Sequence, residues 1–210
     1  MDGIFKKNIT AMNYGTHNSA TGGRLVWWLR PFSWLINLTS KCQSNTILDQ
    51  LSDGVRLFNL QVALVGGKWR FTHGLAVYKE GVFETIAKMK SCASAREPIY
   101  FQLYLDKCFW CKQNIEEFEF LVEQLKNEFC DKNFVMLFAW IEGGEDYIDG
   151  TDCYSYPEWE EHYWTLAWGK TFGKTWLDRL PLPKRHARLH NAEYKKNCKT
   201  EYLMLDFYGL

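Results

Sequence analysis

The chain has 210 residues, the length of one folded domain. It is 47% hydrophobic and 24% charged, a composition typical of a globular protein with a full core. Lysine plus arginine and aspartate plus glutamate each total 25, and this balance argues against a nucleic-acid-binding protein, which usually carries a basic excess. We therefore expect a single domain over residues 1–210 and no nucleic-acid partner.

Strand and helix patterns alternate along the chain. They predict strands over 9–14, 55–65, 68–72, 99–105, 134–141 and 202–207, and helices over 43–52, 82–94 and 115–129. Gly66 and Gly67 mark a hairpin turn between the second and third strands. The alternation predicts an α/β fold with a mostly parallel sheet and helices outside it. The pattern does not decide whether that sheet closes into a barrel.

Two later segments are less regular. The acidic, glycine-containing segment 142–161 predicts a long loop. No element is predicted for residues 162–200, because Pro181 and Pro183 interrupt the pattern.

The start of the chain and its cysteines bear on its location. Met1 is followed closely by Lys6, Lys7 and polar residues, without the apolar core of a cleavable signal. No apolar run reaches the roughly 18 residues of a membrane span. The 7 cysteines are irregularly spaced, which favours free thiols in a reducing compartment. We expect a cytoplasmic or otherwise intracellular protein, and association with a virion stays open for a viral or phage origin.

One close cysteine pair, Cys108 and Cys111, has the spacing of a redox or metal motif. A zinc site needs further ligands at defined spacing, and neither a second such pair nor a spaced histidine pair follows. We read the pair as two thiols at a strand end, with redox or metal use as the alternative.

Three polar residues at predicted strand ends could carry chemistry. His17 lies in the segment 15–19, Gly-Thr-His-Asn-Ser, and His73 stands before Gly74 after another strand. Barrel enzymes place catalytic groups at the carboxyl ends of strands, and two histidines suit paired acid and base work near neutral pH. Asp206 ends the last apolar strand and could orient an imidazole, as the acid of a triad does. Taken singly, each of these residues is also explained by a structural role.

Four motifs in order resemble those of phosphatidylinositol-specific phospholipase C. The segment 15–19 is similar to the Gly-Thr/Ser-His-Asp/Asn-Ser signature of that family, and 50–61 resembles its Gln-Leu-x-x-Gly-Val/Ile-Arg strand. The pair 73–74 resembles the His-Gly of the family, and 205–207 its last barrel strand. Residues 143–200 carry no such motif. The resemblance implies a compact, irregular TIM-type (β/α) barrel of the phospholipase-C-like phosphodiesterase kind.

The resemblance also implies a mechanism and a substrate. His17 would be the general base for the inositol 2-hydroxyl, His73 the general acid for the diacylglycerol oxygen, and Asp206 would orient His17. The expected substrate is a phosphodiester of the phosphoinositide kind.

The sequence departs from the family where phosphate charge is compensated. Relatives carry an arginine, or acids that hold calcium, where this chain has the neutral Asn59 and Gln61, and Tyr104 stands at the position that normally supplies a Lys or Glu. We expect these three residues, with Asn18 and Arg56, to contact the substrate, although Arg56 also matches a structural arginine of the family. Asn59 and Gln61 lack the negative charge that favours a hard cation, so no metal and no cofactor is expected.

A tryptophan-rich segment covers residues 24–38 and lies outside the predicted strands and helices. Trp27, Trp28 and Trp34 lie there beside arginines, a composition that suits a lipid headgroup interface. We expect either peripheral membrane contact from the rim of the barrel or a helix packed beneath it.

These observations favour a metal-independent phospholipase-C-like phosphodiesterase. A catalytically degenerate relative that binds a phosphorylated ligand is the first alternative, because the charge clamp is missing. A barrel kept only as a structural or assembly scaffold is the second.

Overall fold

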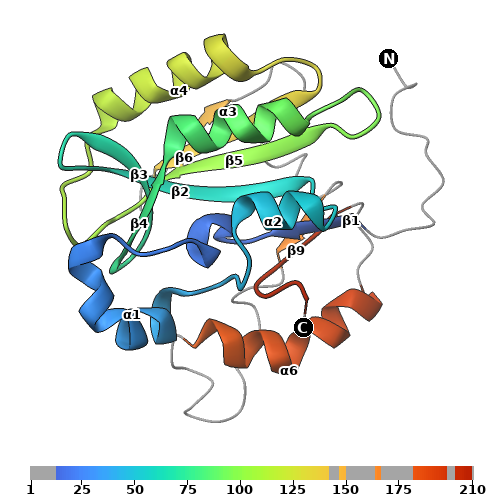
Figure 1. Cartoon of the computed structure of the whole chain (residues 1–210). Helices are drawn as coiled ribbons and strands as arrows, with labels where there is room; N and C mark the ends of the chain where they lie inside the picture. The colour runs from blue at the N-terminus through green and yellow to red at the C-terminus, as the bar shows by residue number, and fades with distance from the viewer. Residues whose placement is uncertain (1–12, 142–146, 150–163, 167–181, 198–201, 210) are drawn as a thin grey trace.

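One mixed β-sheet organises the computed structural model, which describes residues 13–141, 147–149, 164–166, 182–197 and 202–209 (Figure 1). The main path through the sheet runs β7-β6-β5-β2-β1-β9-β8, and β3 and β4 form a hairpin beside β2. The strands are β1 (Asn13–Thr16), β2 (Leu57–Val65), β3 (Lys68–His73), β4 (Ala76–Gly81), β5 (Ile99–Leu105), β6 (Phe134–Ile141), β7 (Tyr147–Asp149), β8 (Trp164–Leu166) and β9 (Tyr202–Leu205).

The strands of the main path are parallel except at one edge. β6, β5, β2, β1, β9 and β8 pair in parallel, whereas β7 is antiparallel to β6. Among the described residues, the outer strands β7 and β8 do not pair with each other, so the expected barrel is an open one.

The helices cover the outer face of this sheet. α3 (Val82–Cys92) and α4 (Ile115–Phe129) lie over the half of the sheet formed by β2, β5 and β6 (Figure 1). Their buried side chains join Phe58, Leu60 and Val62 of β2 in the main core. Since side chains alternate across a strand, the residues between these three face inward. A smaller cluster on the inner face contains Leu57, Leu137, Phe138, Tyr202 and Met204.

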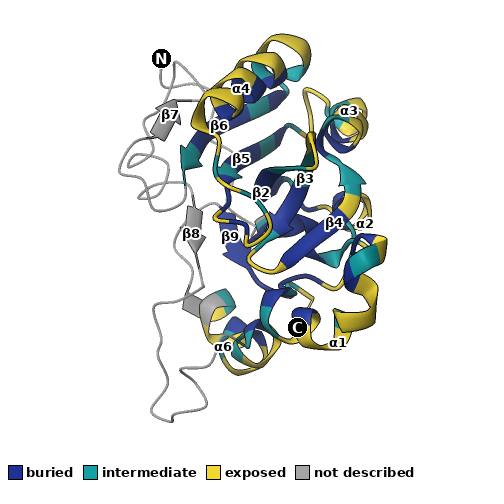
Figure 2. Ribbon diagram, turned by 90° about the vertical axis from the view of Figure 1, so that its left-hand side faces the viewer, coloured by how far each residue is buried: buried dark blue, intermediate teal, exposed yellow. Residues whose placement is uncertain are grey.

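The other described helices are η1 (Ser19–Gly22), η2 (Trp27–Phe32), α1 (Ser33–Ser40), α2 (Ile47–Ser52) and α6 (Pro183–Asn197). α1 and α6 lie in the lower part of the molecule in Figure 1. Figure 2 shows buried central strands flanked by helices whose outer faces are exposed. Among the residues that the structure describes, no helix has both the length and the apolar character needed to cross a membrane.

Several sequence expectations need correction. The hairpin strand β4 was not predicted, and the segment expected to be a loop contains β7. α2 begins at Ile47 rather than at Gln43, because Thr46 and Asp49 form a capping box that starts the helix there. β8 and α6 fall in the unassigned region, and Pro183 opens α6 at a position where proline is tolerated. The last strand ends at Leu205, and the predicted strand residues 9–12 lie outside the described residues.

Candidate active site

Two strands meet end to end along one edge of β2, and this brings the two candidate histidines together. β1 pairs with Leu57 and Phe58, while β3 runs antiparallel against the stretch from Val62 to Val65. Val62 also pairs with β5, so β3 must lie on the opposite edge, the same edge as β1. His17 follows β1 and His73 ends β3, so both lie at the gap between the two strands.

The backbone turns sharply where β1 ends. Asn18 adopts a left-handed conformation with φ 46°, which asparagine tolerates better than most residues. The backbone N–H of His17 donates to the Leu205 carbonyl at 3.1 Å, and that of Asn18 donates to Asn59 Oδ1 at 3.1 Å. His17 is therefore tied to the end of β9, directly before Asp206, and Asn18 to the inner face of β2.

His17 and Asp206 form a buried pair. Nδ1 of His17 lies 2.9 Å from Oδ1 of Asp206, and only 7% and 5% of the two residues are exposed. A neutral imidazole that donates from Nδ1 to a carboxylate carries its lone pair on Nε2. The pair therefore presents Nε2 of His17 as the proton-accepting nitrogen.

His73 is oriented by a backbone carbonyl. Its Nδ1 donates to the carbonyl of Ser40, at the end of α1, at 2.8 Å. The next residue, Gly74, has φ 58°, and its N–H donates to Oδ2 of the buried Asp106 at 3.2 Å. The turn after β3 is thus fixed by an acid that follows β5.

The side-chain amide of Asn18 lies between the two imidazoles. Its Nδ2 is 3.1 Å from Nε2 of His73 and 3.3 Å from Nδ1 of His17. Both distances start from the same Asn18 atom, so Nε2 of His73 and Nδ1 of His17 can be no farther apart than twice the longer distance. That separation is within the span of one phosphodiester group. Since Nδ1 of His73 donates to the Ser40 carbonyl, Nε2 of the neutral ring accepts an amide hydrogen of Asn18.

Neutral amides line the inner face next to this pair. Asn59 Nδ2 donates to Oε1 of Gln102 at 3.2 Å, on the neighbouring strand β5. Gln61 Oε1 and Gln102 Nε2 are buried without a hydrogen-bond partner among the described residues. Tyr104 is in register with Gln61 and packs edge-on against Phe138. Four of the expected substrate-binding residues, Asn18, Asn59, Gln61 and Tyr104, thus lie on or beside this inner face.

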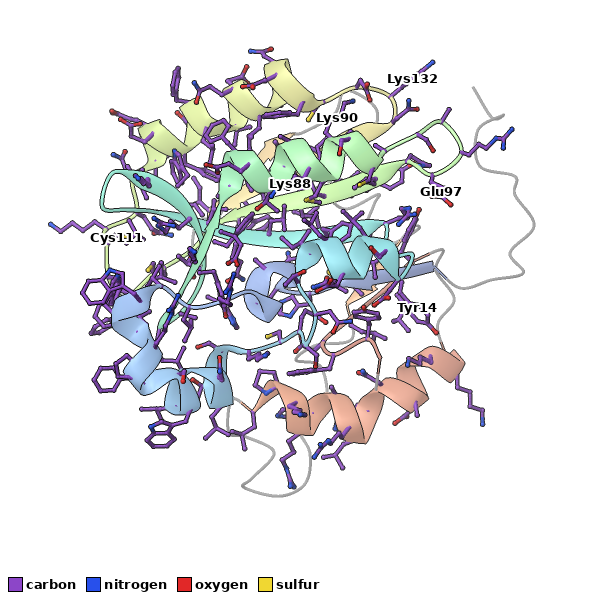
Figure 3. All side chains as sticks on the ribbon, in the orientation of Figure 1. Tyr14, Lys88, Lys90, Glu97, Cys111 and Lys132 are labelled. Atoms are coloured by element: carbon purple, nitrogen blue, oxygen red, sulfur yellow. The ribbon has the colours of Figure 1, made fainter. Side chains whose placement is uncertain are left out.

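Arg56 is placed elsewhere. Its guanidinium pairs with Glu97 at 2.7 Å and donates to the carbonyls of Leu51 and Val55. Arg56 and Glu97 precede β2 and β5, whereas Cys111 follows β5, and Figure 3 shows Glu97 and Cys111 at opposite ends of the molecule. The structure therefore gives Arg56 a structural contact at the amino ends of the strands, which is the structural alternative considered from the sequence.

Sequence reasoning missed three residues that support the backbone of the site or pack against it. The Gln43 side-chain amide donates to the carbonyls of His17 and Leu205, at 2.9 and 2.7 Å. Asn191 of α6 donates to the carbonyls of Asp206 and Phe207. Cys42 is fully buried, and burial together with the Asp206 charge raises the pKa of its thiol well above the usual value. Cys42 and Gln43 lie in a loop and Asn191 lies on a helix that the sequence did not predict, so no local pattern pointed to these roles.

The Cys108 and Cys111 pair lies in the loop after β5. Burial raises the pKa of Cys108 to about 12 and also raises the pKa of Cys111. Within the same loop, Phe109 N–H donates to the Gly74 carbonyl and Trp110 Nε1 donates to the Leu75 carbonyl. The loop therefore supports the turn that follows His73, and its thiols are poor nucleophiles at neutral pH.

Exposed apolar side chains gather on the segments around His73. We call this group the apolar rim, and it consists of Trp27, Phe32, Trp34, Phe109 and Trp110. Trp27 and Trp34 are 77% and 72% exposed, whereas Trp28 is half-buried and packs edge-on against Trp110 at 5.0 Å. α1 carries part of this rim and ends at Ser40, whose carbonyl binds His73. The rim therefore borders the candidate site.

Comparisons by sequence and by structure gave different outcomes. No protein-family model matches the sequence, and no curated protein matches it. A solved variant of the phosphatidylinositol-specific phospholipase C from Staphylococcus aureus matches with a TM-score of 0.60 at 15% identity, covering 97% of this chain and 89% of the other. The Listeria monocytogenes phosphatidylinositol-specific phospholipase C matches with a TM-score of 0.56 at 13% identity, covering 96% and 90%. A third match, from work on modulation of membrane binding by the S. aureus protein, has a TM-score of 0.57 at 15% identity, covering 97% and 88%.

Proposed function

We propose that this chain, whose fold is that of phosphatidylinositol-specific phospholipase C, is a metal-independent phosphodiesterase that cleaves a phosphoinositide-type substrate. The observation that carries the proposal is the arrangement of the two histidines: His17, held by buried Asp206, and His73 both contact the Asn18 amide. Two imidazoles at this separation can serve as base and acid on one phosphodiester.

His17 acts as the general base. Its Nε2 takes the proton of the inositol 2-hydroxyl, and the oxygen attacks phosphorus. Asp206 accepts the hydrogen bond from Nδ1 and stabilises the imidazolium that forms.

His73 acts as the general acid. Its Nε2 proton passes to the diacylglycerol oxygen as the bond to phosphorus breaks, which leaves diacylglycerol and a cyclic inositol phosphate. Nδ1–H remains bonded to the Ser40 carbonyl, so Nε2 is the ring nitrogen that carries the proton to be transferred. Asn18 Oδ1 is buried without a partner among the described residues, and a turn of the amide would let this oxygen accept from protonated Nε2.

A catalytically degenerate binding protein is the second candidate. Asn59, Gln61 and Gln102 give the inner face no cation to offset charge on the phosphorane, and such stabilisation is often a large part of catalysis. The same amides can still hydrogen-bond a phosphorylated ligand. A scaffold role remains only if neither turnover nor ligand binding is found.

A direct assay tests the main proposal. The full chain is incubated with phosphatidylinositol vesicles, with and without a chelator, and phosphorus NMR follows the appearance of the cyclic inositol phosphate. We expect turnover at the same rate in both. Turnover that requires added calcium would contradict metal independence, and no hydrolysis of inositol or other phosphodiesters would favour the binding protein.

We further propose that the apolar rim docks on lipid. Replacing Trp27 and Trp34 together with alanine should weaken binding to phospholipid vesicles at least about tenfold, since each exposed indole would bury apolar area on docking. Trp28 is left intact because it packs against Trp110. The matched control is Phe120→Ala, which removes a 60% exposed aromatic side chain from α4 outside the rim. Equal co-sedimentation of the double variant and the parent would rule the rim out as the lipid contact.

A further inference from the structure

The buried pair of His17 and Asp206 has a third potential ligand beside it. Cys42, from the loop between α1 and α2, places its Sγ so that ligand atoms of all three residues lie within 4.8 Å of one another. All three residues are buried, and Cys42 is 0% exposed. The proposed mechanism uses the histidine and the carboxylate but gives the thiol no task.

Three connections hold the segments that carry these ligands together. Phe207 N–H donates to the Cys42 carbonyl at 2.7 Å, which ties the Asp206 segment to the Cys42 loop. The Gln43 amide bridges the carbonyls of His17 and Leu205. The ligands are therefore pre-organised by the backbone, and binding an ion would require only small side-chain movements.

One ligand atom is a buried carboxylate oxygen without a hydrogen-bond partner among the described residues. Asp206 is 5% exposed, and its Oδ2 has no hydrogen-bond partner among the described residues, although Oδ1 is bonded to His17. A buried carboxylate oxygen without a donor is costly unless a cation or water occupies its vicinity. This orphaned oxygen is a second observation that points to a ligand.

The donor set selects the kind of ion. One sulfur, one imidazole nitrogen and one carboxylate oxygen are donors that zinc accepts with three protein ligands and one open position. Calcium and magnesium prefer oxygen ligands throughout, so a thiolate and an imidazole disfavour them.

A cavity lies next to the segments that carry two of the ligands. A cavity of about 270 Å³ is lined by Gln43 and Phe207, which directly follow Cys42 and Asp206 in the chain, and by the carboxylate of Asp53. Negative charge in a cavity raises the local concentration of cations.

We propose that His17, Cys42 and Asp206 form an inhibitory binding site for zinc or a similar thiophilic divalent cation. The ion takes the position of the Nδ1 proton between His17 and the carboxylate, that proton moves to Nε2 of the same ring, and the Cys42 thiol releases its proton to solvent as it becomes a thiolate ligand. His17 can then no longer accept the substrate proton, and Asp206 can no longer stabilise the imidazolium that would form. The inhibition rests on the proposed function, whereas the binding does not.

Cobalt substitution tests the binding by itself. The full-length, reduced, metal-free protein is titrated with Co²⁺, which gives a thiolate-to-cobalt charge-transfer absorption when sulfur is a ligand. We expect saturation at one equivalent, displacement by Zn²⁺, and loss of the absorption in Cys42→Ser. The affinity of Cys42→Ser for Zn²⁺ by calorimetry should fall by at least about 10–100-fold, the range seen when even outer-shell partners are lost.

The other close thiol pair is the matched control. The double variant Cys108→Ser with Cys111→Ser should keep the absorption and the affinity. If that variant loses them while Cys42→Ser keeps them, the ion binds at the loop after β5 and the proposal is wrong. If Cys42→Ser fails to fold by circular dichroism, alkylation of the parent decides: Zn²⁺ should protect Cys42 in peptide mapping under mild denaturant, and absence of protection overturns the site.

Inhibition is measured separately. The zinc concentration that halves the turnover of each protein, relative to its own metal-free rate, should be at least about tenfold higher in Cys42→Ser than in the parent. Equal values would overturn the inhibitory role. If the parent shows no turnover, the phosphodiesterase proposal fails while the cobalt titration still decides the metal site.

Discussion

Alanine at either histidine should abolish most of the turnover. We expect His17→Ala and His73→Ala each to lower kcat on phosphatidylinositol by about 10²–10⁴-fold, because each removes a positioned proton-transfer group. His186→Ala is the matched control, since His186 lies on α6 and has no part in the proposed mechanism. Turnover by either site variant at the parent's rate would exclude the His17–His73 mechanism.

The leaving group can assign the two roles. A substrate whose leaving group is a nitrophenolate needs little protonation, so the deficit of His73→Ala should largely disappear on it, while the deficit of His17→Ala should remain. Equal deficits on both substrates would contradict the assignment of His73 as the acid. The reverse pattern would exchange the roles of the two residues.

Adding a cation to the inner face should raise a weak activity. Gln61 carries a buried Oε1 without a partner and lies on β2, two residues after Asn59 and in register with Tyr104. In Gln61→Arg the guanidinium can grip phosphate oxygens in a bidentate way that an amide cannot. We expect kcat on an inositol phosphodiester to rise by about 10²-fold, the size of effect seen when one oxyanion donor is removed from an enzyme.

Other results of Gln61→Arg separate the remaining interpretations. A fall in kcat would indicate that another cation already compensates the phosphate. A change in ligand affinity without turnover in either protein would favour the binding protein. Gln61→Met is the matched control, because it keeps the length of the side chain and removes the polar group, and it should not raise kcat.

Much of the fold was predictable because its signals are local. β5, α4 and β6 have the predicted bounds, Ile99–Leu105, Ile115–Phe129 and Phe134–Ile141, since each is an apolar run or an amphipathic repeat with clear ends. β4 was missed because its segment, Ala-Val-Tyr-Lys-Glu-Gly, is apolar only in its first half and shows neither strict alternation nor a continuous apolar run. β8 was missed because its three residues are too few for a periodic signal.

The candidate site was predictable only in part. His17, His73 and Asp206 stand at strand ends in recognisable motifs, but their catalytic roles remain predictions. Cys42, Gln43 and Gln102 were missed because their positions matter only through contacts with distant segments, such as the bond from Gln43 to the Leu205 carbonyl. For Arg56 the motif allowed both a structural and a substrate-binding role, and only the tertiary structure shows that its guanidinium pairs with Glu97.

The sequence by itself determined the α/β class, most of the strands, the helices α2, α3 and α4, and the resemblance to phosphatidylinositol-specific phospholipase C. Those properties depend on residue types and their spacing over a few turns of chain, which a sequence displays directly. Only the tertiary structure decided that β1 and β3 meet along one edge of β2, that Asn18 joins the two histidines, and that Cys42 lies beside Asp206. These proximities arise from strand pairing between residues far apart in the chain, and no local pattern encodes which strands become neighbours.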